Sequence, residues 1–337
     1  MRKHRVNADS ERFWACLLAA DASAGRRIVS GQLDDGVPGS TIIRDLLVPA
    51  QHAVGLAWQS ASWSVADEHA ATAVVDSALA AVESSNAVRR VTGRVYVMAC
   101  AESEWHSMPA RLAAQLVRES GAQVRFLGAS LPADPLREYL AQVRPAALLL
   151  SATMPTSLPG AARCIDAAHD VGVKVIVGGG AFGADESRAR TLQADAWMLD
   201  PGELSGVRFW DRPSRAPRWE ACLALQADAE AVVAAAYGRL LVDLPQPREM
   251  WPIQQLLTRD DFGRIVDFTA TSLLLDDSRV LSAFVSWLAD VLEARHVPRG
   301  VLIPSLLALA AAMDDVAKSA GSKPPLLLRR VAARAVA

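Results

Sequence analysis

The chain has 337 residues, a length that predicts two or three domains, each able to bury a core of its own. Lysine and arginine total 35 against 37 aspartate and glutamate, so the net charge of -2 gives none of the basic excess on which nucleic-acid binding depends. Although 51% of the residues are hydrophobic, every long apolar stretch is interrupted by a charge, Gly or Pro, which argues against a membrane span.

The N-terminal segment MRKHRVNADSERF is charged and is not followed by the apolar core of a secretion signal, so we expect a cytoplasmic protein. The four cysteines, Cys16, Cys100, Cys164 and Cys222, are far apart and form no CxxC pair. This scatter predicts neither a zinc site nor a disulfide framework, and buried thiols are the simplest expectation.

Residues 1–92 are predicted to form a helical bundle. Phe13, Cys16 and Leu17 keep one face of a first helix apolar, and a second helix around Leu46 follows a GVPGS break at 36–40. A third long helix, rich in alanine, is expected to begin at Ser62 or Ser64.

Residues 93–212 have the pattern of a doubly wound parallel sheet. Short apolar segments alternate with helical stretches in the order RVYVMA, QVRFLG, AALLLS, VKVIVG and AWMLD. Continuous apolar runs are typical of strands buried on both faces. Right-handed crossovers would then place a ligand beyond the carboxyl ends of the strands. We therefore expect an α/β multidomain protein with a Rossmann-like central domain.

Residues 213–325 are predicted to form an all-α domain, which follows a proline-rich joint at 211–219. The expected helices are 219–242, 248–258, 262–275, 279–296 and 302–318. The last segment, KPPLLLRRVAARAVA, is expected to be a loosely held tail.

A carboxylate and an imidazole follow the first predicted strand, in the segment ESEWHSMPARL. Glu104 and His106 should therefore lie at the ligand edge of the sheet, with Ser107 capping a helix entered through Pro109. An imidazole there can coordinate a metal through one nitrogen while a carboxylate holds the proton on the other. Taken alone, the pair is also typical of a hydrogen-bonded surface histidine.

Small and hydroxyl-bearing residues follow two further strands at the same edge. Ser151 and Thr153 come after the third strand, and Gly178 and Gly179 after the fourth. Hydroxyls can bond a polar ligand, and glycines let the backbone approach a bulky one closely. Ordinary strand-to-helix turns are the alternative interpretation.

Together these residues resemble the cobalamin-binding fold of methionine synthase and corrinoid proteins, whose signature is Asp-x-His-x-x-Gly. In that family the histidine replaces the cobalamin's own base as lower axial ligand, so the resemblance implies that His106 binds the cobalt. It also implies that the pocket for the displaced nucleotide tail lies at Ser151, Thr153, Gly178 and Gly179. Glu104 stands where the signature has Asp, and Pro109 where it has Gly.

The bundle carries a second resemblance. Trp58, then nine residues, then Glu68 and His69, is the spacing found in the cap of light-sensing adenosylcobalamin proteins. The resemblance implies that these three side chains line a pocket over the upper face of the corrin, where the adenosyl group lies. Alternatively, Trp58 and Trp63 are core aromatics and the polar pair is a solvated helix face.

The C-terminal helices look similar to the globin-like modules of photocobilins, through PREMWPIQQLLTRDDFGRIVDF and DDSRVLSAFVSWLADVLEARHVP. That resemblance implies a bound biliverdin, held noncovalently, for which Cys222 would form no link. The residues considered as bilin contacts are Trp251, Phe262, Phe268, Trp287 and His296, although aromatics at helical spacing are more often core.

The resulting hypothesis is a non-enzymatic photoreceptor. Light would break the cobalt–carbon bond, the adenosyl group would leave, and the released cap would change the oligomeric state and signal to an unidentified partner. One alternative is a corrinoid methyl carrier of a methyltransferase system. Another is a non-photochemical cobalamin-binding or storage module. A flavodoxin-like receiver is disfavoured because strand one lacks an acidic cluster.

Overall fold

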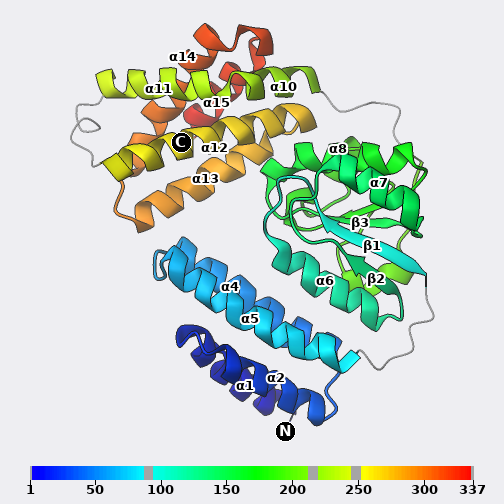
Figure 1. Ribbon diagram of the computed structural model, residues 1–337. Coiled ribbons are helices and arrows are strands. Elements are labelled where there is room, and N and C mark those ends of the chain that lie inside the picture. The colour runs from blue at the N-terminus through cyan, green and yellow to red at the C-terminus, as the bar shows by residue number, and fades with distance from the viewer. Residues whose placement is uncertain (1, 87–93, 212–218, 244–251, 335–337) are drawn as a thin grey trace. The chain divides into compact units, whose positions relative to one another are not determined.

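The computed structural model describes residues 2–86, 94–211, 219–243 and 252–334. These residues form two compact units, of which the first contains the helical bundle and the sheet and the second contains the C-terminal helices (Figure 1). The predicted domain limits at 92/93 and 212/213 lie outside the described residues.

The N-terminal bundle consists of α1 (Arg2–Leu18), α2 (Ala22–Asp34), α3 (Gly39–Ile42), α4 (Val48–Gln59) and α5 (Val65–Asn86). The first expected helix is thus two helices, because the Asp21 side chain accepts the Ala24 N–H (2.8 Å) and caps a new one. Ser64, rather than Ser62, caps α5. Its N–H donates to Asp67 Oδ2 (2.9 Å), and its hydroxyl accepts the Asp67 N–H (3.2 Å).

The bundle core contains the apolar faces of α1, α2 and α5. Phe13, Val29, Val75 and Leu79 are almost completely buried there. Gly25 on α2 is required by the close approach of α5, since a Cβ at that position would lie 2.7 Å from Val74 Cγ1. This contact fixes α2 directly against α5.

A π-helical turn, η1 (Ile43–Leu47), connects α3 to α4, and the sequence pattern did not predict it. The Val48 N–H donates to Ile43 O, five residues back, and Pro49 follows at the start of α4. A proline has no N–H to donate to the preceding turn, so the wider turn occurs where regular α-helical bonding is interrupted.

All five predicted strands are present and form one parallel sheet in the order β2-β1-β3-β4-β5. They are β1 (Val95–Cys100), β2 (Gln123–Phe126), β3 (Leu148–Ser151), β4 (Val175–Gly178) and β5 (Ala196–Trp197). The intervening helices are α6 (Ser107–Glu119), α7 (Ala133–Val143), α8 (Leu158–Asp170) and α9 (Ser187–Thr191), with a 3-10 turn η4 (Pro201–Gly206) after β5. The sheet is Rossmann-like, as predicted from its apolar runs.

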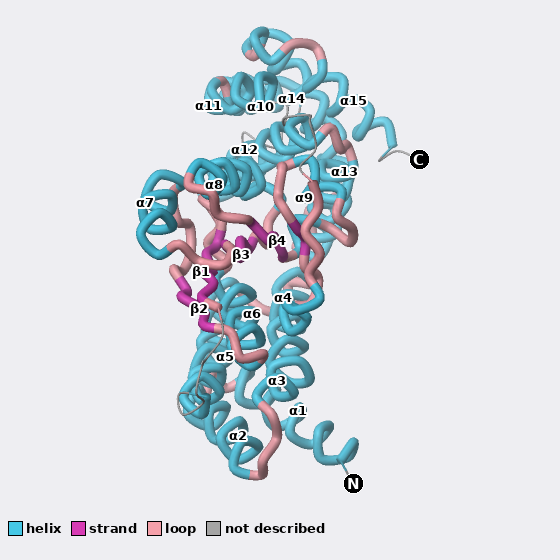
Figure 2. The backbone as a smooth tube through the Cα atoms, turned by 90° about the vertical axis from the view of Figure 1, so that its right-hand side faces the viewer, coloured by secondary structure: helices cyan, strands magenta, loops and turns pink. Residues whose placement is uncertain are grey.

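Helices cover the sheet on both sides, with α7 and α8 on one face and α6 on the other (Figures 1 and 2). Helix α6 also contacts the bundle. Its Met108, Leu112 and Leu116 belong to the bundle core, while Ala110 and Ala114 pack toward the sheet. One helix therefore contributes to both hydrophobic cores of the first unit.

The second unit is all-α, as predicted. It consists of α10 (Trp219–Ala227), α11 (Ala229–Asp243), α12 (Pro252–Leu275), α13 (Arg279–Ala294), α14 (Leu302–Val316) and α15 (Lys323–Arg334). The expected break at 259–261 is wrong, because no Gly or Pro stands there to end α12. The expected tail from Lys323 is also wrong. Leu328, Val331 and Ala332 of α15 are buried at helical spacing, so the unit continues beyond residue 325.

All four cysteines are buried thiols, as the sequence predicted. No helix among the described residues is both long enough and apolar enough to cross a bilayer.

The packing of α15 can be tested with two leucines. Leu328 is fully buried, whereas Leu326 on the same helix is 46% exposed. Leu328→Ala should lower the free energy of unfolding by about 3 kcal/mol, because it removes buried methyl groups and leaves a cavity. Leu326→Ala should lower it by less than about 1 kcal/mol. Urea denaturation followed by circular dichroism measures both, and equal effects would contradict a packed α15.

Candidate functional site

The register of the sheet brings two predicted positions, Ser151 and Gly178, into one row at its carboxyl edge. Cys100 at the end of β1 pairs with Ser151 at the end of β3, which in turn pairs with Gly178 at the end of β4. The loops that follow these strands therefore lie side by side. This is the edge at which doubly wound sheets bind their ligands.

Glu104 is the centre of the hydrogen bonding at this edge, although its side chain is only 1% exposed. Its Oε1 accepts the backbone N–H of His106 (2.9 Å) and pairs with His106 Nδ1 (2.7 Å). Its Oε2 accepts the N–H groups of Thr153 (2.6 Å) and Met154 (2.9 Å) and the hydroxyl of Ser157 (3.1 Å). One carboxylate thus joins the loop after β1 to the loop after β3.

This environment shifts the pKa values of both members of the pair. Burial alone would raise the pKa of Glu104, but the hydrogen bonds from His106, Met154 and Thr153 outweigh it and lower the pKa to about 2. The hydrogen bond to Glu104 raises the pKa of His106 against the opposing effect of burial, and the charges of Glu104 and Glu68 add to the rise. Glu104 is therefore a carboxylate at neutral pH.

His106 stands at the N-cap position of α6, and its side chain is 59% exposed. Ser107 is the first residue of the helix rather than its cap, which corrects the sequence expectation. Pro109 lies within the first turn, where its missing N–H costs no helical hydrogen bond. Because Glu104 engages Nδ1, Nε2 is the ring nitrogen left to coordinate a ligand.

The loops after β3 and β4 approach each other closely. The Ala152 N–H donates to Gly178 O (3.1 Å), and the Ala181 N–H donates to Ala152 O (3.1 Å). Gly179 has φ +99°, and a Cβ there would collide with the Ala152 carbonyl. Among the described residues, the buried Thr153 Oγ1 has no hydrogen-bond partner. Glycine at position 179 thus lets the loop after β4 pack closely on the loop that carries Ser151 and Thr153.

The predicted cap residues lie at the junction of α4 and α5. Trp58 is half-buried near the end of α4, and Glu68 and His69 are in the first turns of α5. Glu68 Oε2 pairs with His69 Nδ1 (2.6 Å). The charge of Glu68 contributes to the raised pKa of His106, so this end of α5 lies near the carboxyl edge of the sheet.

A polar chain that the sequence did not predict holds Glu68 in place. Gln51 Nε2 donates to Thr72 Oγ1 (3.1 Å), and the Thr72 hydroxyl donates to Glu68 Oε1 (3.1 Å). Gln51 lies on α4 and Thr72 on α5, so these hydrogen bonds connect the two helices. Both Glu68 oxygens are thereby engaged.

Ion pairs connect the bundle to the sheet at two places. Arg44, in the π-helical turn, makes a two-pronged contact with Asp200 after β5, with both N–O distances 2.6 Å. On α6, Arg111 pairs with Asp76 and with Glu83 (2.7 Å), both on α5. These pairs could not be predicted from the sequence pattern, because each joins segments that are distant in the chain.

Two family models match this part of the chain. Residues 94–207 match a B12 binding domain, and residues 10–83 match a second model that is also described as a B12 binding domain. The first unit is a cobalamin-binding module. The matched ranges coincide with the sheet domain and the helical bundle, so both halves of the module are accounted for.

Two known proteins are similar to the module. The HTH-type transcriptional repressor CarH of Myxococcus xanthus is 28% identical over 209 residues, which are 60% of this chain and 67% of the repressor. A monomethylamine corrinoid protein of Methanosarcina barkeri aligns with a TM-score of 0.52 at 19% identity, over 58% of this chain and 95% of its own. At that identity the second similarity shows the fold alone.

The residues at the carboxyl edge fit a cobalamin. A corrin supplies its own equatorial nitrogens, so the protein needs to offer one axial ligand, and His106 Nε2 is held for that role by Glu104. Among the described residues, no group of three or more His, Cys, Asp or Glu is arranged to hold a bare metal ion. The Thr153 hydroxyl, which has no hydrogen-bond partner among the described residues, would bond the nucleotide tail. Burial raises the pKa of Cys100 to about 12, so this thiol does not compete for cobalt.

The residues considered as bilin contacts in the C-terminal unit differ in their burial. Phe262 and Phe268 are buried, and Phe268 stacks on Phe284 with centroids 3.8 Å apart. Trp287 is partly buried and stacks on the other side of Phe284 (5.8 Å), whereas His296 is exposed. Trp251 lies outside the described residues. Phe268 and Trp287 thus pack on Phe284 in the helical core.

Replacing Glu104 should change the titration of His106. In Glu104→Gln the pKa of His106 should fall, because the hydrogen bond that the imidazole donates to the Glu104 carboxylate, the main cause of the raised pKa, is lost. Glu102→Gln is the matched control. Glu102 lies in the same loop as Glu104, but it pairs with Arg163 on α8 and does not contact His106. An NMR titration of the imidazole in the cobalamin-free protein measures the shift. An unchanged His106 titration in Glu104→Gln would contradict the pairing.

Proposed function

We propose that the module is the sensory part of a non-enzymatic photoreceptor that binds adenosylcobalamin with His106 as the lower axial ligand. The observation that carries the proposal is the pairing of Glu104 with His106 Nδ1 at the sheet edge, with Glu68 of the bundle close enough to influence the same imidazole. The similarity of bundle and sheet together to a transcriptional repressor supports a regulatory role.

Different residues of the chain would contact the two faces of the corrin. Below it, Glu104 would hold the tautomer and orientation of His106 for binding of the cobalt through Nε2. Thr153 would bond the nucleotide tail beside the Gly179 turn. Above it, Trp58, Glu68 and His69 would surround the adenosyl group. When bound, adenosylcobalamin supplies a light-labile bond between cobalt and carbon.

The signal would arise from the arrangement of the bundle. A ligand shifts a conformational equilibrium only through different affinities for the two states, so the adenosyl group must favour one position of α4 and α5. The Arg44–Asp200 contact is suited to such a shift, because both side chains are partly exposed and the pair contributes at most about 1 kcal/mol. Its loss would remove one of the contacts that hold the bundle to the sheet domain. We infer that the shift of the bundle alters self-association and contact with a signalling partner.

The corrinoid methyl carrier remains the alternative function, since the module of this chain shares its fold with the monomethylamine corrinoid protein. A storage module is the second alternative. Binding of biliverdin by the C-terminal unit remains a prediction of the photocobilin resemblance. Reconstitution with biliverdin belongs in the light-sensing experiment below, in which absorption spectra are recorded.

Lower-face ligation can be measured directly. Protein labelled with [15N]histidine and loaded with cobalamin should show, in the paramagnetic resonance spectrum of the Co(II) form, splitting that changes with the nitrogen isotope. His106→Ala should lose this dependence, and His52→Ala, an exposed histidine on α4, should keep it. A spectrum insensitive to the label would contradict His106 as the ligand.

Light sensing is tested on the same protein by changing the upper ligand. Adenosylcobalamin-loaded protein should change its absorption spectrum and its mass in solution after green light, as measured by chromatography with light scattering. Protein loaded with cyanocobalamin should retain its mass. If the adenosyl form binds but keeps its mass in light, the sensor is excluded and the carrier or storage function stands.

The polar chain on the bundle offers a test of the upper face. Thr72→Val removes the hydroxyl between Gln51 and Glu68, so the preference for adenosylcobalamin over methylcobalamin should fall about tenfold, the effect of about 1.4 kcal/mol. Thr72→Ser retains the hydroxyl and should retain the preference. Equal preference in the wild type and both variants would show that Glu68 does not contribute to the upper pocket.

A further inference from the structure

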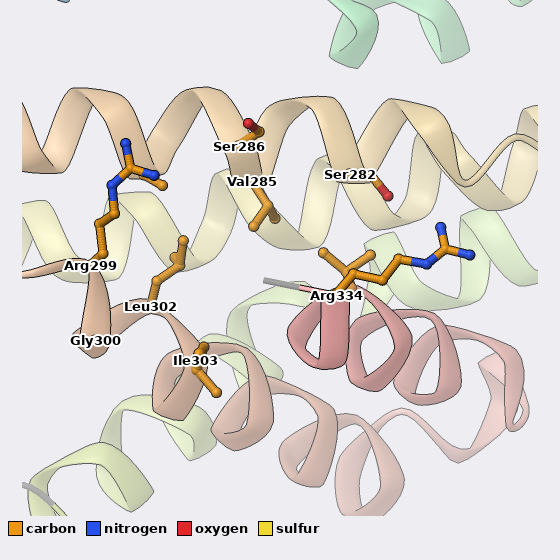
Figure 3. A pocket seen from close by; sticks show the side chains of 10 residues that line it. Ser282, Val285, Ser286, Arg299, Gly300, Leu302, Ile303 and Arg334 are labelled. Carbon is orange, nitrogen blue, oxygen red and sulfur yellow. The ribbon is translucent and has the colours of Figure 1, made fainter. Parts of the chain in front are cut away.

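A pocket of about 400 Å³ lies in the C-terminal unit between α13, α14 and α15, next to the 3-10 turn η6 (Arg299–Val301) (Figure 3). Val285, Leu302 and Val331 are buried side chains that give it apolar walls, and Ile303 adds to them. Both the volume and the mostly apolar lining are typical of sites for small organic molecules.

The charged groups of the pocket are all cationic. Arg299 and Arg334 line it, and no Asp or Glu is among its lining residues. Figure 3 shows the two arginines toward opposite ends, with Ser282 at the same end as Arg334. The Arg334 end therefore favours the anionic end of a ligand.

The two arginines differ in their partners. Arg299 pairs with two carboxylates, Asp290 (2.6 Å) and Glu293 (2.7 Å), which more than offset its single positive charge. For Arg334 the described part of the chain provides no ion-pair partner. A ligand's negative charge would therefore be drawn to the end where Arg334 and the Ser282 hydroxyl lie, because an uncompensated guanidinium is the stronger partner.

We propose that this pocket binds an amphipathic monocarboxylate of medium chain length. Its carboxylate would pair with Arg334, and its chain would lie along Val285 and Leu302 toward Arg299. A volume of about 400 Å³ holds about a dozen heavy atoms at the packing of a liquid, which is the size of decanoate. The inference concerns the second unit only and does not depend on cobalamin.

The test is calorimetric titration of the full chain with decanoate and, separately, with decanol, which has the same chain without the charge. Decanoate should bind at least about tenfold more tightly than decanol, because only the carboxylate pairs with Arg334. Arg334→Gln should weaken decanoate binding about tenfold or more. Arg330→Gln, which removes the same charge from an exposed position on α15 outside the pocket, should leave it unchanged.

A second variant keeps the proposal falsifiable if Arg334→Gln perturbs the helix. Ser286→Trp places a bulky ring in the pocket from an exposed position on α13 and should abolish decanoate binding. Absence of decanoate binding in the wild type, equal effects of Arg334→Gln and Arg330→Gln, or full binding by Ser286→Trp would each overturn the proposal. The cobalamin absorption spectrum, recorded in parallel, reports on the first unit independently.

Discussion

The buried carboxylate of Glu104 accepts hydrogen bonds from the loop after β1, through His106, and from the loop after β3, through Thr153, Met154 and Ser157. A charge in the protein interior is costly unless its oxygens are fully engaged, and here both are. The pKa of Glu104 is low because the hydrogen bonds from the two loops favour the ionised carboxylate. The orientation of the His106 ring follows from this one side chain.

Helix α6 carries that arrangement into the rest of the first unit. It begins directly after His106, contributes Met108 and Leu112 to the bundle core, and pairs through Arg111 with α5. A change in the position of the bundle would therefore also act on α6, whose N-cap residue His106 is the proposed cobalt ligand. Because α6 is packed into two cores at once, the bundle and the ligand edge are mechanically coupled without any long pathway.

The sheet and its ligand edge were predictable because buried parallel strands leave continuous apolar runs, and because strand ends locate the following loops. Glu104 and His106 were found as a local pair for this reason. Ser157 and Met154 were not, since their contact with Glu104 depends on how two loops about 50 residues apart meet. The π-helical turn also left no clear signal in the pattern. Helix α15 did leave one, the spacing of Leu328, Val331 and Ala332, but as the last segment of the sequence it was expected to be a tail.

The two departures from the family signature are compatible with each other in this structure. Glutamate is one methylene longer than aspartate, and at this position it reaches His106 with one oxygen and the β3 loop with the other. Pro109 would restrict a loop that needed to be flexible, but it lies in the first turn of a helix that starts at Ser107. With the helix beginning so early, the histidine is positioned by the carboxylate and by the N-cap backbone. The glycine of the signature is therefore not required for the ring to present Nε2.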